Sequence, residues 1–338
     1  MRIWIDLANS PHVPFFRALV TRFEELGHHC EISARDFAET VPLAHAAGFS
    51  PQVIGAHGGR KYSGKATNLA SRARALASWA RGRRFDLAVS HNSYSQILAA
   101  KLLRLKSVTL MDYEYQPASH LAFRLSSRVV VPQSFPETRL RRFGARAAKV
   151  RRYNGTKEDV YLAGFEPDEN FRAGLCKLGI KPDNVLVLMR PPARAALYHR
   201  FENKLFDYAI TQLRTRPGVQ IILLPRNAEQ RGFYSGQLGE NLLMPAEVLD
   251  GPNLIAASDL VLSAGGTMNR EAAALGVPAA SIYAGRWAAV DEELMREGRL
   301  SRISAPADIE ELQLCKKKKT NPRRAVTVRD EVAKLILA

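Results

Sequence analysis

The sequence predicts an α/β protein made of two Rossmann-like domains facing a cleft. Three observations predict this class. Short apolar segments alternate with segments of helical periodicity along the chain. The length of 338 residues exceeds what a single ordinary core accommodates. Between residues 165 and 184 the alternation gives way to a segment rich in Pro, Asp, Asn and Gly, which separates a domain of residues 1–165 from one of residues 166–338.

The first half begins with a strand at residues 2–5 and a helix at residues 14–26 that ends at Gly27, a helix C-terminal signal. Further predicted strands cover residues 29–34, 52–54, 85–89, 107–111, 128–131 and 150–153. Further predicted helices cover residues 38–47, 96–103 and 119–125, with a long basic segment at residues 58–84. Strands that alternate in this way with helices of about a dozen residues form a parallel sheet covered on both faces.

The second half repeats this pattern. Its predicted strands cover residues 185–189, 219–224, 260–263 and 279–283. Its predicted helices cover residues 201–213, 229–238, 267–275 and 290–297, and a terminal helix at 328–337 follows a basic run at 316–324. The second half is therefore a second α/β layer structure.

Composition limits the class of protein. No segment approaches the roughly 20 apolar residues that span a bilayer. The N-terminus runs directly into a strand without a signal peptide, so we expect a cytoplasmic protein, free or peripheral at the inner face of the membrane. Cys30, Cys176 and Cys315 lack metal-binding spacing, and we expect them to be reduced and structural. The net charge of +16 indicates an anionic partner, and without a recognition motif we expect no specific nucleic-acid binding.

A glycine pair at the end of a predicted strand marks a candidate phosphate site. In "DLVLSAGGTMNREAAALGVP" the strand ends at Ser263, and a helix follows Gly265 and Gly266. A helix N-terminus offers unpaired N–H groups, and glycines allow an anion to approach the backbone. Thr267 adds a hydroxyl, and Glu271, one turn later, could accept hydrogen bonds from a ribose. The alternative is that the pair makes only a tight turn, with Glu271 a surface residue.

The same stretch resembles the nucleotide-binding segment of GT-B glycosyltransferases and UDP-N-acetylglucosamine 2-epimerases. The resemblance implies that Ser263, Gly265, Gly266 and Thr267 hold a diphosphate and that Glu271 holds the ribose. "NSPHVPFFRALVTRFEELGH" is similar to the first loop and helix of MurG-type glycosyltransferases, although the glycine-rich run of that loop is absent.

Four segments together resemble the uncharacterised DUF354 family over nearly the whole chain. These are "IDLANSPHV", "MRPPARAALYH", "LLPRNAEQR" and "GGTMNREAAALGVP". The resemblances imply a GT-B fold, in which the terminal helix packs back on the first domain. They also imply a metal-independent glycosyltransferase without a cofactor, whose substrate is a nucleotide-diphosphate sugar. The alternatives are a nucleotide-sugar 2-epimerase and a non-catalytic nucleotide- or polyanion-binding protein.

Residues after strands of the first domain are the candidates for the chemistry. His12 could take a proton from an acceptor hydroxyl, or it caps a helix. Asp112 and Glu114, in "MDYEYQP", could act as a base or bind sugar hydroxyls, or they belong to a polar loop. His91 could line the same wall and bind sugar.

Cationic side chains of the second domain could stabilise the leaving diphosphate. Arg190 and Arg194 follow its first strand, and Arg226 follows its second strand. Asp291 and Glu292 could reach the donor sugar, or they begin a solvated helix.

The basic segment at residues 60–84 could contact an anionic membrane or a lipid-linked acceptor, or it is a solvated helix.

Overall fold

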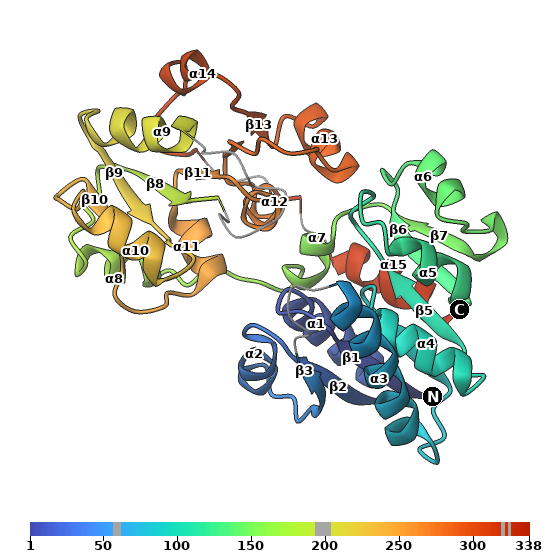
Figure 1. Cartoon of the computed structure of the whole chain (residues 1–338). Helices are drawn as coiled ribbons and strands as arrows, with labels where there is room; N and C mark the ends of the chain where they lie inside the picture. The colour runs from blue at the N-terminus through green and yellow to red at the C-terminus, as the bar shows by residue number, and fades with distance from the viewer. Residues whose placement is uncertain (57–61, 193–203, 319–321, 324–325) are drawn as a thin grey trace. The chain divides into compact units, whose positions relative to one another are not determined.

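The computed structural model describes residues 1–56, 62–192, 204–318, 322–323 and 326–338, and the chain divides into two compact units (Figure 1). The N-terminal unit contains residues 1–163, 288–290 and 325–338. The C-terminal unit contains residues 164–287 and 291–324. The chain therefore leaves the N-terminal unit after Ala163 and returns to it for the last residues.

The N-terminal unit contains a seven-stranded parallel sheet in the order β3-β2-β1-β4-β5-β6-β7. Its strands are β1 (Arg2–Leu7), β2 (His29–Asp36), β3 (Gln52–Ala56), β4 (Leu87–Ser90), β5 (Ser107–Leu110), β6 (Arg128–Pro132) and β7 (Val150–Tyr153). The strand order reverses between β1 and β4. In doubly wound sheets this switch point is where ligands bind, beyond the carboxyl ends of the strands.

Helices cover both faces of this sheet. The helices are α1 (His12–Glu25), α2 (Thr40–Ala46), α3 (Tyr62–Ala80), α4 (Tyr94–Leu102), α5 (Ser119–Leu125), α6 (Glu137–Arg142), α7 (Lys157–Tyr161) and α15 (Val326–Leu337), with a 3₁₀ turn at Ala147–Lys149. α1, α7 and α15 pack together on one face, and α3, α4 and α5 pack in sequence on the other.

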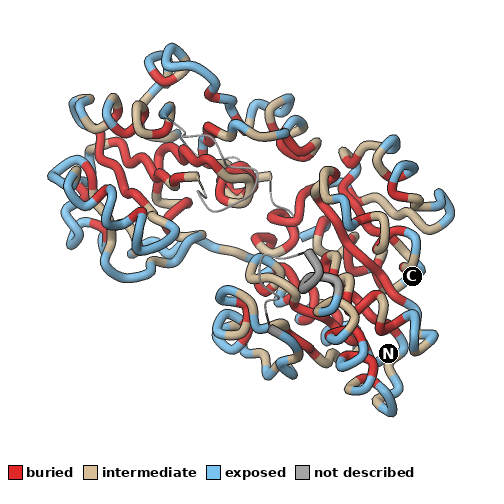
Figure 2. The backbone as a smooth tube through the Cα atoms, in the orientation of Figure 1, coloured by how far each residue is buried: buried red, intermediate tan, exposed pale blue. Residues whose placement is uncertain are grey.

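The two faces follow from the alternation of side chains along β1. Ile3, Ile5 and Leu7 belong to the apolar core shared with α1 and α15, whereas Trp4 belongs to the core shared with α3 and α4. A strand buried on both faces reads as an almost continuous apolar run, as "IWIDL" does. Figure 2 shows the central strands of both units as buried, whereas the edge strands β3 and β13 are largely exposed.

The C-terminal unit contains a six-stranded parallel sheet in the order β10-β9-β8-β11-β12-β13. Its strands are β8 (Val185–Arg190), β9 (Val219–Leu223), β10 (Leu242–Leu243), β11 (Leu260–Ser263), β12 (Ala279–Ser281) and β13 (Ser301–Arg302). Its helices are α8 (Phe171–Cys176), α9 (Lys204–Arg214), α10 (Ala228–Ser235), α11 (Gly251–Ala257), α12 (Gly266–Leu275), α13 (Ala289–Arg296), which begins within residues 288–290, and α14 (Pro306–Glu310). The switch point lies between β8 and β11, and the predicted class of two Rossmann-like domains is confirmed.

The structure differs from the predicted elements where they are short. Helices α6, α7, α8, α11 and α14 and strands β10 and β13 were not expected, because two to seven residues carry too little periodicity to be recognised. α1 begins at His12, two residues before the predicted start. Pro14 lies in its first turn, where the missing backbone N–H would have no helical partner in any case.

Asp259 fixes the segment that precedes the terminal helix. This buried carboxylate accepts hydrogen bonds from the backbone N–H of Leu186 at 2.9 Å and of Lys317 at 3.1 Å. The Lys317 ammonium also donates to the carbonyls of Ala256 and Ser258 at the end of α11, and its burial lowers its pKa to about 8. Part of the basic run at 316–324 is therefore bound to the C-terminal unit.

Candidate functional site

Four ionisable side chains meet at the switch point of the N-terminal sheet. His12 begins α1, His91 follows β4, and Asp112 lies just beyond β5. The ring centroids of His12 and His91 are 4.9 Å apart, and His91 Nε2 lies 3.5 Å from Asp112 Oδ1. Lys157, the first residue of α7, places Nζ 3.0 Å from Asp112 Oδ2. The structure brings three predicted residues together and adds Lys157, which sequence reasoning missed.

A capping box positions Lys157. Thr156 Oγ1 accepts a hydrogen bond from the Asp159 N–H at 3.3 Å, and Asp159 Oδ2 accepts one from the Thr156 N–H at 2.7 Å. The resulting short helix α7 packs against α1 and α15. Its first residue, Lys157, is therefore buried in the interior of the unit. Glu158 is fully buried, and its Oε1 lies 3.9 Å from Lys157 Nζ. The threonine-to-aspartate spacing in "TKED" was the signal that could have revealed this helix start.

The surroundings of His12 favour its neutral form. Burial lowers its pKa well below the ordinary value, the positive charges of His91 and Lys157 lower it further, and the Asp112 carboxylate opposes them. The ring nitrogen Nδ1 is buried and has no hydrogen-bond partner among the described residues. A neutral imidazole with one unpartnered nitrogen is suited to accept a proton or a hydrogen bond from a ligand.

Asp112 is held from two sides. Its two oxygens face different basic side chains, since Oδ2 accepts a hydrogen bond from Lys157 and Oδ1 lies near the His91 ring. Such an arrangement suits a carboxylate that orients His91 better than one that removes a proton from a substrate. The role of Asp112 as a base stays a prediction.

Glu114 lies in the same loop and is buried, with 2% exposure. Its neighbours Tyr113 and Tyr115 contact each other edge to face, with ring centroids 5.6 Å apart. The Arg139 guanidinium lies over the Tyr115 ring, 4.8 Å from its centroid. Stacking of these aromatic rings on a sugar, like the role of Glu114, stays a prediction.

A second buried network supports the end of β1. Arg72 of α3 donates to both oxygens of Asp6, at 2.8 and 2.9 Å, and Ser33 and Ser93 also donate to this carboxylate. Arg72 belongs to the basic segment at residues 60–84. Within the same segment Arg83 pairs with Glu31 and lies over the Trp79 ring. Arg72 and Arg83 therefore make contacts within the N-terminal unit. Contact of the basic segment with a membrane stays a prediction.

In the C-terminal unit, Arg190 and the glycine pair lie side by side at the switch point. Arg190 ends β8 and pairs in register with Ser263 at the end of β11, and its carbonyl accepts a hydrogen bond from the Ala264 N–H at 3.2 Å. The buried Ser263 hydroxyl donates to the Gly265 carbonyl at 3.0 Å and lies 3.0 Å from Asn269 Oδ1. Ser263 therefore stabilises the turn itself, and its contact with a diphosphate stays a prediction.

The glycine pair leaves room for guanidinium groups. A Cβ at Gly265 would lie 2.9 Å from Arg226 Nη2, and a Cβ at Gly266 would lie 3.2 Å from Arg270 Nη2. Arg226 follows β9, and its Nε donates to the Pro191 carbonyl at 2.8 Å. Gly265 caps α12 without a side-chain hydrogen bond to the first N–H groups. The start of α12 thus combines open backbone donors with an arginine.

The other predicted residues of this unit differ in their surroundings. Asp291 is buried and accepts two hydrogen bonds from Arg270, at 2.7 and 3.0 Å, whereas Glu292 is exposed. Thr267 and Glu271 are partly exposed on the first turns of α12. Arg194 lies outside the described residues. The roles of these residues in binding nucleotide or sugar stay predictions.

The described residues contain no group of three His, Cys, Asp or Glu side chains arranged to hold a metal ion. Among the same residues no helix is long and apolar enough to cross a membrane.

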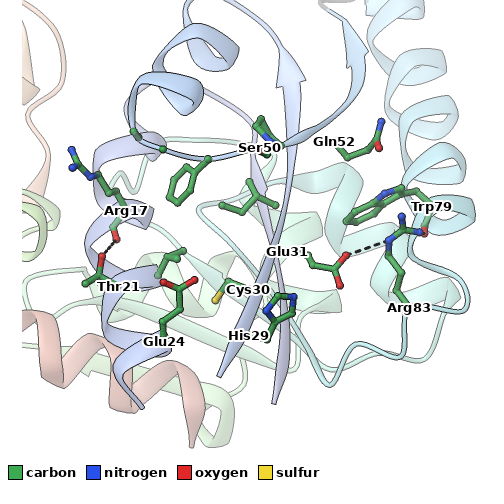
Figure 3. A pocket seen from close by; sticks show the side chains of 16 residues that line it. Arg17, Thr21, Glu24, His29, Cys30, Glu31, Ser50, Gln52, Trp79 and Arg83 are labelled. Carbon is green, nitrogen blue, oxygen red and sulfur yellow. Dashed lines mark hydrogen bonds and ion pairs between the residues drawn. The ribbon is translucent and has the colours of Figure 1, made fainter. Parts of the chain in front are cut away.

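A separate pocket of about 640 Å³ lies in the N-terminal unit (Figure 3). Its walls come from α1, the first residues of β2, the turn before β3 and the end of α3, and include Arg17, Glu31, Gln52 and Trp79. It lies at the amino end of β2, whereas the histidine cluster lies beyond the carboxyl ends of the strands. Cys30 borders this pocket, and burial raises its thiol pKa to about 12.

The chain is similar to known proteins over its whole length. It is 30% identical over 315 residues to the uncharacterized protein MJ0665 of Methanocaldococcus jannaschii, covering 92% of this chain and 89% of that protein. The crystal structure of the M. jannaschii UDP-GlcNAc 2-epimerase with UDP-GlcNAc and UDP superimposes with a TM-score of 0.72 at 14% identity, covering all of both chains. The spinosyn rhamnosyltransferase SpnG gives a TM-score of 0.62 at 17% identity, covering 100% of this chain and 92% of the other.

These likenesses show the GT-B fold of two Rossmann-like domains. The model of the family described as "Protein of unknown function (DUF354)" matches residues 1–338, and the chain belongs to that family.

Proposed function

We propose that this protein is an enzyme acting on a nucleoside-diphosphate sugar. The C-terminal unit would hold the nucleoside diphosphate at the start of α12, and the N-terminal unit would supply the reactive side chains. The observation that carries the proposal is the buried, unpartnered Nδ1 of His12 in a cluster with His91, Asp112 and Lys157. Perturbed ionisable groups at a topological switch point are typical of catalytic sites.

Glycosyl transfer is the reaction we favour. His12 would take the proton from an acceptor hydroxyl as its oxygen bonds to the anomeric carbon, while the bond to the diphosphate breaks. Open N–H groups of α12, with Arg226 and Arg190, would receive the negative charge of the leaving diphosphate. We propose that this site requires no metal ion, because helix dipole and guanidinium groups can carry that charge.

Epimerisation at the sugar C2 is the second candidate. The protein superimposes on a crystallised UDP-GlcNAc 2-epimerase with full coverage of both chains, and this reaction needs no acceptor. In an epimerase the base removes a proton from the sugar ring, and solvent returns one. Incorporation of solvent deuterium into the sugar would therefore favour epimerisation, and its absence during turnover would favour transfer.

Ligand binding is tested first, by thermal shifts with nucleoside diphosphates and nucleotide sugars. We expect one nucleotide series to raise the melting temperature of the wild type and to lose this effect in Glu271→Ala. Glu229→Ala is the matched control, because Glu229 is an exposed glutamate in the first turn of α10 in the same unit. A panel without any stabilising nucleotide, or an equal response of all three proteins, would contradict the proposal.

Turnover is tested second, with the nucleotide sugar that binds. We expect His12→Gln to retain the thermal shift and to lose turnover, because it changes the reactive end and leaves the nucleotide site intact. A non-catalytic binding protein would instead bind the ligand without consuming it in any variant.

A further inference from the structure

Positive charge is concentrated in two parts of the N-terminal unit, residues 60–84 and residues 124–152. Residues 124–152 contain nine Arg or Lys side chains and a single acid, Glu137. The segment therefore carries a net charge of +8, half of the net charge of the chain, in 29 of its 338 residues. We call it the basic face; its cations are Arg124, Arg128, Arg139, Arg141, Arg142, Arg146, Lys149, Arg151 and Arg152.

Contacts join the elements that carry these cations at the β7 edge of the sheet, with Arg128 and Arg151 on the face that α15 covers and Arg152 on the face that α5 covers. Lys149, in the 3₁₀ turn, donates to the carbonyls of Arg124 and Ser126 at the end of α5, at 3.0 and 3.1 Å. Arg152 of β7 donates to the Phe135 carbonyl at 2.7 Å, which ties the edge strand to the loop before α6. The basic face thus extends over α5, the start of β6, α6, the 3₁₀ turn and the edge strand β7 (Figure 1).

The contacts fix the cations without neutralising them. Arg128 donates to the carbonyls of Leu335 and Ile336 at the end of α15, and Arg151 donates to the carbonyls of Ala148 and Val150. Carbonyl groups orient a guanidinium but carry no compensating unit charge. Burial lowers the Arg128 pKa, and the positive charge of the nearby Arg151 lowers it further.

One acid cannot compensate the remaining charge. Glu137 accepts hydrogen bonds from both Arg141 and Arg152, at 3.3 and 3.0 Å. Arg142 and Arg146 are exposed and form no ion pair in residues 124–152. Charged residues on β7 protect an edge strand from pairing, but this does not account for the arginines of α6.

The chemistry of the surface selects among polyanions. The aromatic residues of the segment, Phe135 and Phe143, are buried, so it offers no ring for stacking on nucleic-acid bases. α6 has six residues, which is short for a helix that reads a DNA groove. No large apolar side chain of residues 124–152 is exposed, so binding would rest on charge alone. An anionic phospholipid surface is recognised in this way.

We propose that the basic face binds the headgroups of an anionic bilayer. This goes beyond the proposed reaction and does not depend on it. It also assigns membrane contact to residues 124–152, in place of the segment at residues 60–84.

The test uses the full chain and sedimentation with vesicles. We expect the protein to pellet with vesicles of phosphatidylcholine and phosphatidylglycerol, to stay in solution with pure phosphatidylcholine, and to dissociate as salt is added. The double variant Arg142→Glu, Arg146→Glu should bind at least about tenfold more weakly, since each basic residue near the surface contributes substantially to binding.

A matched control distinguishes the effect of the basic face from the effect of a lower net charge of the whole protein. Arg74→Glu, Arg81→Glu makes the same charge change at exposed positions of the earlier basic segment, and should bind as the wild type does. Equal weakening of both double variants would overturn the assignment, as would equal pelleting with neutral vesicles or a lack of pelleting with anionic ones. Tighter binding to a DNA duplex than to anionic vesicles would overturn the choice of partner. Circular dichroism checks that both variants are folded.

Discussion

Removal of the Lys157 charge tests the histidine cluster most directly. In Lys157→Met the long side chain remains while the ammonium 3.0 Å from Asp112 Oδ2 is lost. Both side chains are less than a tenth exposed, so the carboxylate would stay buried beside the His91 ring without the Lys157 charge. Breaking a buried pair in this way typically costs about 3–5 kcal/mol of unfolding free energy.

Tryptophan fluorescence during urea denaturation is the assay. Trp4 and Trp79 lie in the N-terminal unit and Trp287 in the C-terminal unit, so Trp287→Phe provides a background in which fluorescence reports the N-terminal unit alone. In this background we expect Lys157→Met to lower the unfolding free energy by about 3 kcal/mol or more. Lys157→Arg, which keeps the charge, should lose much less.

A double-mutant cycle with Asp112→Asn isolates the pair. The double variant buries no charge at either position, so it should be about 2 kcal/mol more stable than the sum of the single effects predicts. Additive effects, or a loss below about 0.5 kcal/mol for Lys157→Met, would refute the buried ion pair. Histidine NMR gives an independent readout, because the His12 pKa should rise once a charge that lowers it is removed.

Three further outcomes follow from single contacts. Gly265→Ala should weaken nucleotide binding about tenfold, because its methyl group would lie 2.9 Å from Arg226 Nη2; Gly236→Ala, with nothing within 4 Å, should bind like the wild type in the same titration. Asp259→Ala should destabilise the C-terminal unit by about 3 kcal/mol in urea, monitored by Trp287 fluorescence in a background with Trp4→Phe and Trp79→Phe, and an unchanged midpoint would contradict its anchoring role. Cys30, with its thiol pKa of about 12, should resist alkylation at pH 8 under conditions that label the exposed Cys176, as mass spectrometry of the peptides would detect; equal labelling rates would contradict its burial.

The pH dependence of the unfolding free energy tests the direction in which folding shifts the His12 pKa. Its pKa in the folded protein lies below its unfolded value, so the unfolded chain binds more protons between the two values. Stability should therefore fall as the pH drops below about 6.5, the ordinary histidine value. His12→Gln should show a shallower fall, measured as urea midpoints across this range, and an identical slope in both proteins would contradict the neutral buried ring.

The sequence was sufficient for the fold and for placing the candidate residues at strand ends. Buried strands such as β8 and β11 are continuous apolar runs, and the turn signals after them place His12, His91, Asp112 and the glycine pair at strand ends. Parallel strands bring their carboxyl ends to one edge, so proximity within each unit follows from the topology.

The missing parts of the site depend on tertiary contacts. Lys157 lies on a five-residue helix that becomes buried only when α1 and α15 pack around it, and no periodicity indicates this. The sequence places Arg226 at a strand end, but its approach to Gly265 follows from β9 and β11 both flanking β8, which the linear order of the residues does not reveal. The basic face escaped notice because its cations are spread over five short elements, whereas the runs at 60–84 and 316–324 are contiguous.

The return of the chain to the N-terminal unit has a consequence for biosynthesis. Val332 and Ile336 of α15 are fully buried in the same core as Ile3 and Phe16, although more than 300 residues separate them in the sequence. A ribosome releases residues 1–163 long before α15, so the N-terminal unit has an exposed apolar face until α15 emerges. The C-terminal unit has its own core and can fold in the meantime. The twelve residues of α15 therefore complete a domain whose other elements were synthesised much earlier.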